Sequence, residues 1–591
     1  MAKVRHTTIT PKTPVKIQKR PVKNTRVRTN KNRKTTREQH KNNRPLKIIP
    51  LGGLCEIGKN MTAFEYGNDM IIVDCGMAFP EESMPGVDCV IQDYTYVREN
   101  INKLRAVVLT HGHEDHIGGL PYFCREFQCP IYGGKLTVEL VRHKLMENGI
   151  SLSGINLEAH RNGDRVKISN AFEVEFIRVN HSIADSYAIA IRTPVGTVVH
   201  SGDYKVDYTP INGKPIDLQR FGEIGKEGVL LFMCESTNVE IEGNSPSERH
   251  VGEAFQRLFK DAAGRIIVAT FSSHVHRMQQ IITAAEKYNR HVCLSGRSML
   301  NVFKVANSLG YIEMDPETLI DISNIDQYKD DELVILTTGS QAEPMSALSR
   351  MAYASHKAVE IKHGDTVIIS ADPIPGNEKP IYRVINELYR LGATVIYHSL
   401  EDVHVSGHAY RNEIKLLHSL IKPKYVMPVH GEYRMLYLHK TLAESLGTPE
   451  ENIFVMNNGD VLSLTPDSAR LLESVPASAV LIDGKGAADI GSKILSDRRH
   501  LGEDGVVSIG LVVDARKGTL LAPPEISSIG FVFEDEKYDI HREIAIKVAS
   551  TLPKSDIAST VNKNSYKEQI RGLCFSRTRK RPMVMFNVIE M

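Results

Sequence analysis

A run of six residues places four possible metal ligands side by side. His111-Gly112-His113-Glu114-Asp115-His116 directly follows a predicted buried strand. Zinc binds imidazole nitrogens and carboxylate oxygens, and a catalytic zinc site leaves one position open for water. Two histidines at i and i+2 of an extended segment point to the same side, so His111 and His113 are placed to bind one ion. Asp115 and His116 lie on the following turn, where they are placed to reach a second ion.

Further candidate ligands stand at the ends of other predicted strands. They are His181 after a strand at 174–179, Asp203 after one at 197–200, and His430 after one at 425–429. Each signal is weak by itself, because His and Asp are common at strand ends. Together with the His-rich run, the three residues indicate one metal site assembled from several strand ends.

Apolar segments between turns indicate the elements that must position these side chains. A β-rich layer begins with predicted strands at 47–53, 70–74 and 106–110. Between about 246 and 394 three strands each precede a helical pattern, at 265–270, 332–337 and 365–370. This alternation predicts a parallel, doubly wound sheet. A third unit follows about residue 462, with strands near 506–514, 530–533 and 582–590 and a helix near 543–551.

Composition limits the class of protein. With 591 residues, 41% hydrophobic and 24% charged, the chain has the length of about three or four globular domains. No apolar run approaches the roughly 20 residues of a membrane span, and no secretory signal is present. The eight cysteines show no CxxC spacing, which excludes a disulfide scaffold and a cysteine-type zinc finger. We therefore expect a cytoplasmic protein without membrane contact.

The net charge of +2 conceals a strong asymmetry. Residues 1–45 hold fifteen of the 73 Lys and Arg residues and a single acidic residue, Glu38. The remainder of the chain is therefore acidic. The first 45 residues have almost no large apolar side chains, so they are predicted to be a disordered basic arm. Such an arm is typical of contact with RNA or ribosomes, although a solubilising tail has the same composition.

The order of the candidate ligands resembles the metallo-β-lactamase fold, in which HxHxDH precedes a distal His, an Asp in SGD and a late His. A doubly wound insert of about 150 residues before the last ligand resembles the β-CASP branch of that fold, whose members cut nucleic acids. Two flanking motifs strengthen this resemblance: Cys234-Glu235-Ser236-Thr237-Asn238 before the insert and His404-Val405-Ser406-Gly407-His408 after it. The motifs that resemble bacterial ribonuclease J in particular are residues 270–277, 296–299, 337–345 and 373–378.

This resemblance implies a fold and its domains. The expected class is α/β, a metallo-β-lactamase αββα sandwich with an inserted doubly wound β-CASP domain and a small α+β C-terminal domain. The expected boundaries are a basic arm at 1–45, the split metallo-β-lactamase domain at 46–245 and 395–461, the insert at 246–394, a linker at 462–474 and a C-terminal domain for oligomerisation and RNA contact at 475–591.

The resemblance also implies a set of metal ligands. His111, His113 and His181 would hold one zinc, Asp115, His116 and His430 would hold the other, and Asp203 would bridge the two. Zn²⁺ is expected at two ions per subunit, with Mn²⁺ or Mg²⁺ as alternatives, because an N/O site accepts several divalent ions. Asp74, at the end of a predicted strand, is expected to orient a ligand histidine or the metal-bound water.

The implied activity is ribonucleolytic: 5′→3′ exonuclease action that prefers a 5′-monophosphate, and endonuclease cleavage, in rRNA processing and mRNA decay. Attack by hydroxide on the phosphodiester would use the two metals together with Asp115 and Asp203. His408, beside Glu235, would act as general acid or phosphate contact. The expected substrate-binding residues are Ser273, His274, Val275, His404, Val405, Ser406, Gly407 and His408.

Three positions depart from the family's pattern. Glu235 stands where Asp is expected, His274 where Asn is expected, and Ala342 where Gly is expected. None of them removes a metal ligand. His274 adds a titratable group to the expected phosphate pocket, so the preference for the 5′ end is open at this stage.

The expected partners are single-stranded RNA and further copies of the chain in a homodimer or homotetramer. A paralogous ribonuclease J subunit, RNA-decay proteins or the ribosome are further candidates. Three alternatives remain at this stage: a β-CASP nuclease that acts on DNA, a small-molecule hydrolase of the same fold, and a non-catalytic RNA-binding subunit. The insert argues against the second alternative and the full ligand set argues against the third.

Overall fold

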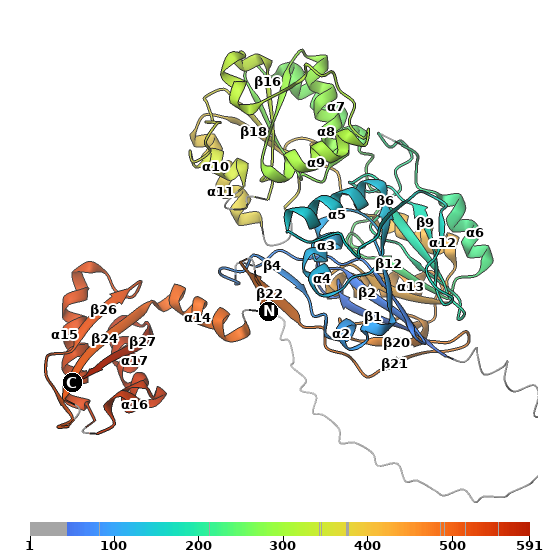
Figure 1. The fold of residues 1–591 in the computed structure, drawn as a ribbon. Coiled ribbons are helices and arrows are strands. Elements are labelled where there is room, and N and C mark those ends of the chain that lie inside the picture. Colours follow the sequence, from blue (N-terminus) through green and yellow to red (C-terminus); the bar gives the residue numbers. More distant parts are fainter. Residues whose placement is uncertain are drawn as a thin grey trace, which may run out of the picture. The chain divides into compact units, whose positions relative to one another are not determined.

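The computed structural model describes residues 44–591, apart from 82, 212, 342, 344–345, 374–376, 485, 490, 515 and 554. The basic arm up to residue 43 and Ala342 therefore lie outside the described residues. Within the described part no helix combines the length and apolar character that a bilayer crossing requires. Figure 1 shows the sheets of this part of the chain and the helices around them.

Two sheets packed face to face form the central layers. The first has the strand order β21 (Ala469–Leu472), β20 (Val461–Leu464), β1 (Leu46–Gly52), β2 (Met61–Tyr66), β3 (Asp69–Val73), β5 (Leu104–Val108), β6 (Ile131–Gly134) and β7 (Leu157–His160). The second has the order β19 (Tyr425–Val429), β12 (Leu231–Glu235), β11 (Thr197–His200), β10 (Tyr187–Arg192), β9 (Glu173–Arg178) and β8 (Arg165–Lys167). Side chains from both sheets, including Phe64 and Phe176, share one buried cluster.

Helices cover the outer face of each sheet. The first sheet is covered by α2 (Thr95–Glu99), α4 (Leu120–Glu126) and α5 (Lys135–Glu147), and the second by α6 (Leu218–Glu227), α12 (Arg411–Ile421) and α13 (Tyr433–Ser445). Burial of their apolar sides, such as Phe123 on α4 and Phe221 on α6, holds them in place. This is the predicted αββα sandwich, which is thereby confirmed.

A third sheet, in the insert, has only parallel pairs among its described strands. Its order is β15 (Leu319–Ile320), β14 (His291–Ser295), β16 (Leu333–Thr337), β13 (Ile266–Ala269), β17 (Thr366–Ile369) and β18 (Thr394–Tyr397). The helices on its two faces are α7 (Arg249–Asp261), α8 (Val275–Lys287) and α9 (Arg297–Ser308), and α10 (Ala347–Ala352) and α11 (Glu378–Arg390). The insert is therefore doubly wound, as predicted (Figure 1). Its last strand, β18, runs past the expected boundary at 394.

Two sequence-based expectations are wrong. Residues 462–474 are not a linker, because β20 and β21 extend the first sheet and Leu462 and Leu464 are fully buried in the cluster between the sheets. Residues 530–533 are not a strand. The strand lies earlier, as β26 (Glu525–Ile529). It ends just before Gly530, whose φ of +67° suits glycine and interrupts extended structure.

The C-terminal residues form a small α+β unit. Its sheet contains β24 (Val506–Asp514), β25 (Thr519–Leu520), β26 and β27 (Met583–Glu590), and its helices are α15 (Glu534–Thr551), α16 (Ile557–Asn562) and α17 (Asn564–Thr578). These elements enclose their own apolar core. Before this unit come β22 (Ala479–Asp483), which pairs with β4 (Cys89–Gln92) and β23 (Gly486–Asp489), and α14 (Gly491–Asp504).

Candidate metal centre and active site

The candidate ligands come from one edge of the two central sheets. The His-rich run follows β5 and leads into α3 (Glu114–Ile117), while His181, Asp203 and His430 follow β9, β11 and β19. These strands are parallel or are related through antiparallel neighbours, so their carboxyl ends lie at the same edge. The topology therefore brings together residues up to 319 positions apart in the sequence.

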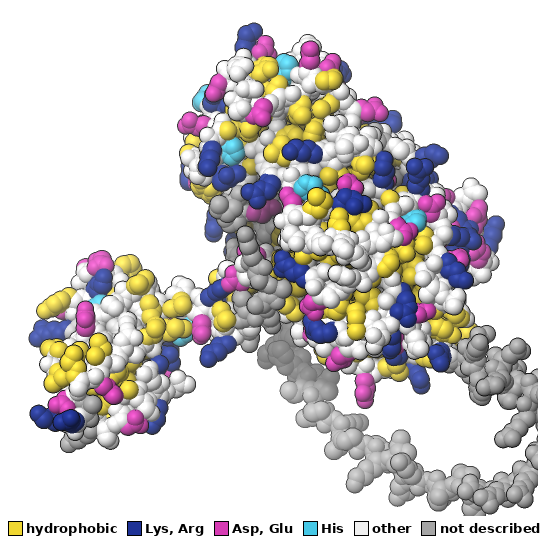
Figure 2. All heavy atoms as spheres, in the orientation of Figure 1, with side chains coloured by type: hydrophobic (Ala, Val, Ile, Leu, Met, Phe, Trp, Pro, Cys, Tyr) yellow, Lys and Arg dark blue, Asp and Glu magenta, His cyan; other side chains and the backbone are white. Residues whose placement is uncertain are grey.

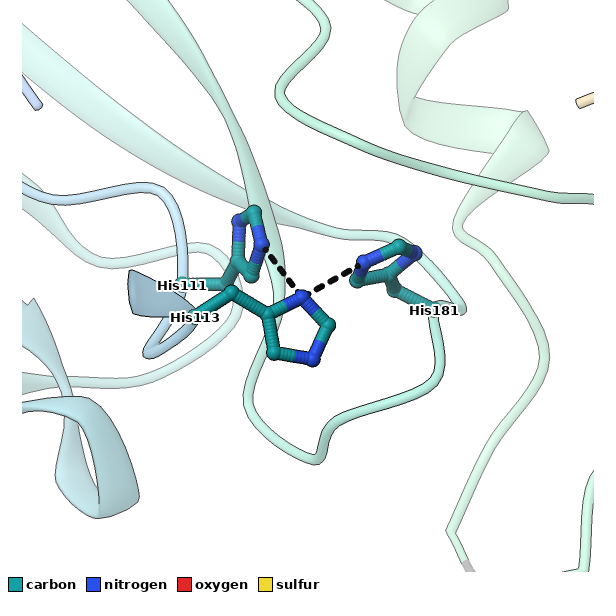
Figure 3. A group of neighbouring side chains, drawn as sticks. All are labelled: His111, His113 and His181. Carbon is teal, nitrogen blue, oxygen red and sulfur yellow. Dashed lines mark hydrogen bonds between the residues drawn. The ribbon is translucent and has the colours of Figure 1, made fainter. Parts of the chain in front are cut away.

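Three histidines form the first group. The Nδ1 atom of His113 lies 3.1 Å from Nε2 of His111 and 3.1 Å from Nε2 of His181 (Figure 3). Burial lowers the pKa of His113 to about 4 and holds those of His111 and His181 well below their ordinary range. All three rings are thus neutral at pH 7, which is the form that binds a metal ion.

The second group contains Asp115, His116, Asp203 and His430. Asp203 also connects it to the first group, because its Oδ2 lies 3.2 Å from His116 Nε2 and 3.7 Å from His111 Nε2. The same oxygen lies 3.5 Å from His430 Nε2. One buried carboxylate oxygen therefore reaches imidazole nitrogens of both groups.

The electrostatics of the second group favour a cation. Burial by itself lowers the pKa of His116, but the carboxylates of Asp203, Asp115 and Asp74 outweigh it and raise that pKa well above its ordinary value. Burial raises the pKa values of Asp115 and Asp203, but the imidazoles of His116 and His430 outweigh it and hold both values low. Such concentrated negative charge, together with nitrogen and oxygen donors, fits zinc and related divalent ions.

Polar neighbours fix the orientation of the ligand rings. Asp74 Oδ2 lies 2.8 Å from His116 Nδ1, so Asp74 contacts a candidate ligand, and its orienting role stays a prediction. The sequence did not predict this kind of contact for two other groups: the Gly407 carbonyl, 2.7 Å from His181 Nδ1, and the Thr237 hydroxyl, 2.8 Å from His430 Nδ1. In each case the contact occupies one ring nitrogen and leaves the other directed at the cluster.

Glu235 and His408 form a close pair beside the cluster, in which Glu235 is buried and the His408 side chain is 23% exposed. Glu235 Oε2 lies 2.7 Å from His408 Nδ1, while Oε1 accepts the N–H of Tyr204 at 2.7 Å. Burial opposes protonation of His408, but Glu235 outweighs it and raises the pKa to about 9. The longer Glu side chain, where Asp was expected, thus reaches the histidine, which carries a proton at pH 7.

Family models match most of the described chain. They are the metallo-β-lactamase superfamily at residues 57–215, the ribonuclease J beta-CASP domain at 263–388, the Zn-dependent metallo-hydrolase RNA specificity domain at 393–456 and the ribonuclease J C-terminal domain at 493–591. Curated relatives agree. Ribonuclease J of Synechocystis sp. is 46% identical, over 82% of this chain and 76% of its own length.

Two further relatives extend the match. Ribonuclease J 1 of Streptococcus pyogenes is 42% identical over 91% of this chain and 96% of its own length. Ribonuclease J of Thermus thermophilus is 45% identical over 78% of this chain and 82% of its own length. The chain belongs to the ribonuclease J family. It is a metal-dependent ribonuclease, and the alternatives of a small-molecule hydrolase and a non-catalytic subunit are set aside.

The residues that the ribonuclease J resemblance implies for substrate binding divide into two sets. His274 is buried, and its Nδ1 and that of His404 have no hydrogen-bond partner among the described residues. Their rings stack with centroids 6.3 Å apart. Val275 and Val405, in contrast, contribute buried side chains to the apolar core, so they offer no side-chain group to a phosphate.

The loop with Ser406 is held by two residues for which the sequence predicted no role, Asn238 and Lys205. Asn238 donates its side-chain N–H to the Ser406 hydroxyl at 2.7 Å, and the buried Lys205 donates to the Ser406 carbonyl at 3.2 Å. Both partners follow strands of the second sheet. The 404–408 segment, which supplies His408, is therefore fixed to the same sheet edge as the candidate ligands. Ser273 is partly exposed, next to His274.

Proposed function

We propose that this chain is a zinc-dependent ribonuclease that removes nucleotides 5′→3′ from RNA with a 5′-monophosphate, and that it also cuts RNA internally. Its roles would be rRNA processing and mRNA decay. The observation that carries the proposal is the position of Asp203, whose one carboxylate oxygen lies within 3.7 Å of imidazole nitrogens in both groups. A bridging carboxylate of this kind suits two metal ions better than one.

His111, His113 and His181 would hold one ion, Asp115, His116 and His430 the other, and Asp203 would contact both. Two Zn²⁺ ions, when bound, lower the pKa of water towards ~7 and neutralise charge on phosphoryl oxygens, and Mn²⁺ or Mg²⁺ would serve as substitutes. The described ligands supply the nitrogen and oxygen donors that this chemistry requires.

His408 would donate its proton to the 3′ oxygen that leaves when the phosphodiester breaks. Glu235 supports this role in two ways: it holds the imidazole at 2.7 Å and it keeps the ring protonated at neutral pH. A positioned acid of this type contributes roughly 10²–10⁴-fold to a rate. Glu235 is thus a positioning residue, because it acts through His408.

His274 and His404 would contact the 5′-phosphate. Burial and the nearby Arg277 hold the pKa of His274 well below its ordinary value, so the ring is neutral at pH 7 and offers an N–H donor. Its unpartnered Nδ1 and that of His404 supply hydrogen-bonding capacity that the protein itself leaves unused. The presence of His at position 274, where Asn was expected, is thus compatible with a phosphate pocket.

The proposed partner is single-stranded RNA, and the proposed assembly is a homodimer or homotetramer formed through the C-terminal unit. A paralogous subunit, RNA-decay proteins and the ribosome are further proposed partners. Exposed apolar side chains in that unit support assembly: Ile529, Phe533 and Tyr538 are 75–79% exposed. Figure 2 shows basic and acidic side chains interspersed over the visible face. In the sequence, residues 1–45 hold fifteen Lys and Arg residues and one acidic residue.

A time course on one RNA with a 5′-monophosphate, a 5′-triphosphate or a 5′-hydroxyl tests the proposal, with single-stranded DNA of the same sequence as control. Immediate release of mononucleotides from the monophosphate RNA is expected. Discrete internal fragments regardless of the end group would refute the 5′-phosphate pocket and leave an endonuclease. Equal cleavage of DNA would refute the restriction to RNA and favour the DNA-acting alternative.

A further inference from the structure

A second cluster of metal-binding side chains lies outside the proposed active centre. It consists of Cys234 in β12, His418 on α12 and His439 on α13, all buried, with 0%, 4% and 0% of each residue exposed. One ligand atom from each residue lies within 4.8 Å of the other two. Among the candidate metal-binding groups of the described residues, this is the only one with a sulfur atom.

The geometry of this cluster is similar to that of the first histidine group. Nε2 of His418 lies 2.9 Å from Nε2 of His439, with ring centroids 5.2 Å apart. The corresponding nitrogens of His111 and His113 are 3.1 Å apart. Two imidazole ligands of a tetrahedral zinc place their nitrogens about 3.3 Å apart, since each Zn–N bond is about 2.0 Å.

A polar neighbour orients one ring of the cluster. The Ser236 hydroxyl lies 2.9 Å from Nδ1 of His439 and leaves Nε2 directed at His418. This is the arrangement by which a ligand histidine is fixed in other metal sites, with one nitrogen occupied and the other free to bind. The Thr237 hydroxyl makes the same kind of contact with Nδ1 of His430 at the proposed catalytic centre.

The protonation states also suit a cation. Burial lowers the pKa of His418 to about 4 and that of His439 well below its ordinary value, so both rings are neutral. Burial raises the pKa of the Cys234 thiol, which therefore keeps its proton when no cation is present. A bound divalent ion deprotonates a thiol outright and releases one proton to solvent.

We propose that Cys234, His418 and His439 form a structural zinc site, distinct from the catalytic pair of ions. The Tyr204 hydroxyl, 3.7 Å from Cys234 Sγ, is the candidate fourth ligand. The ion would tie α12 and α13 to the end of β12, where the next residue, Glu235, holds His408. The site goes beyond the proposed function, and its presence does not depend on the substrate.

The test uses the full-length, tag-free protein in three forms: wild type, Cys234→Ser and, as a matched control, Cys293→Ser, which alters another fully buried cysteine, in β14. Elemental analysis after gel filtration is expected to find one zinc fewer per chain in Cys234→Ser than in the other two. After exchange with Co²⁺, wild type and Cys293→Ser are expected to show a thiolate-to-cobalt charge-transfer band, which Cys234→Ser lacks.

The cobalt spectrum of the wild type decides the question even if Cys234→Ser fails to fold, because the proposed catalytic ligands include no sulfur. Absence of a thiolate band, with equal zinc content in all three proteins, would overturn the proposal and leave a hydrogen-bonded Ser236–His439–His418 chain. Loss of the band in Cys293→Ser would also overturn it. Ribonuclease activity tests the catalytic ions separately, so failure of one proposal is distinguishable from failure of the other.

Discussion

Asp74→Asn offers the sharpest test of how the proposed metal ligands are positioned. Asp74 is buried and accepts three hydrogen bonds of 2.8 Å: Oδ1 from the N–H of Thr110, and Oδ2 from the Thr110 hydroxyl and from His116 Nδ1. An asparagine has the same shape but replaces one acceptor oxygen with a donor NH₂ group. In one orientation that group faces the Thr110 N–H, and in the other it faces His116.

Either orientation leaves one buried donor without its acceptor, which costs about 1–3 kcal/mol. When the NH₂ group faces His116, Nδ1 must become the acceptor, and the proton moves to Nε2, the nitrogen directed at the cluster. Loss of an orienting partner of a ligand histidine typically weakens metal affinity or activity by about 10–100-fold. That range corresponds to about 1.4–2.7 kcal/mol and agrees with the hydrogen-bond estimate.

The assay is zinc affinity by chelator competition, followed by ribonuclease rate as a function of free zinc. Asp74→Asn is expected to need about 10–100-fold more free zinc than wild type, and to approach the wild-type rate at saturation, since every ligand remains. Asp69→Asn is the control, because Asp69 begins β3, the strand that Asp74 follows, but forms a partly exposed ion pair with Arg105. Zinc affinity of Asp74→Asn within about twofold of wild type would refute the reasoning.

Four further outcomes are expected. His113→Ala should abolish RNA cleavage with little change in melting temperature. A wild-type cleavage rate in a nuclease-free preparation would refute the proposed role of His113 as a metal ligand. Glu235→Gln should lower kcat roughly 10–100-fold at unchanged RNA affinity, because His408 loses the charge that holds its proton; unchanged kcat would contradict the proposed acid. Deleting residues 1–45 should weaken RNA binding mostly at low salt, and an unchanged salt slope would show that the arm does not bind. Glu175→Gln should destabilise by roughly 2 kcal/mol at pH 7, since Glu175 is buried against arginines that partly reach solvent. Burial raises the pKa of Glu175, but hydrogen bonds from Arg220 and Arg192 outweigh it and lower that pKa. Its stabilisation is therefore full above the unfolded value of about 4.3 and is lost as the pH falls below it, so the difference from Glu175→Gln in urea unfolding should shrink below about pH 4. A difference independent of pH would contradict this explanation.

Much of the candidate site could be predicted from the sequence because its candidate ligands directly follow strands. A buried strand that ends in His or Asp has a strong local pattern, and the topology of an α/β sandwich places such ends at one edge. The parallel insert was predictable for the same reason, since each of its strands is a short apolar run followed by a helical pattern.

The local sequence pattern led to wrong predictions where a segment packs against residues that are distant in the sequence. Residues 462–474 look like a connection, and only β1, more than 400 positions earlier, provides the surface on which Leu462 and Leu464 are buried. The strand expected at 530–533 was misplaced because its apolar residues follow Gly530, where the backbone turns.

The sequence by itself determined which side chains are available for metal chemistry and in what order the strands present them. Only the tertiary structure decided their partners: Thr237 beside His430, the Gly407 carbonyl beside His181, and Cys234 with His418 and His439. The physical reason is that the pattern of a strand depends on residues that are adjacent in the sequence. A ligand's orientation depends instead on hydrogen bonds between residues up to 226 positions apart, which exist only after the sheets and helices have packed.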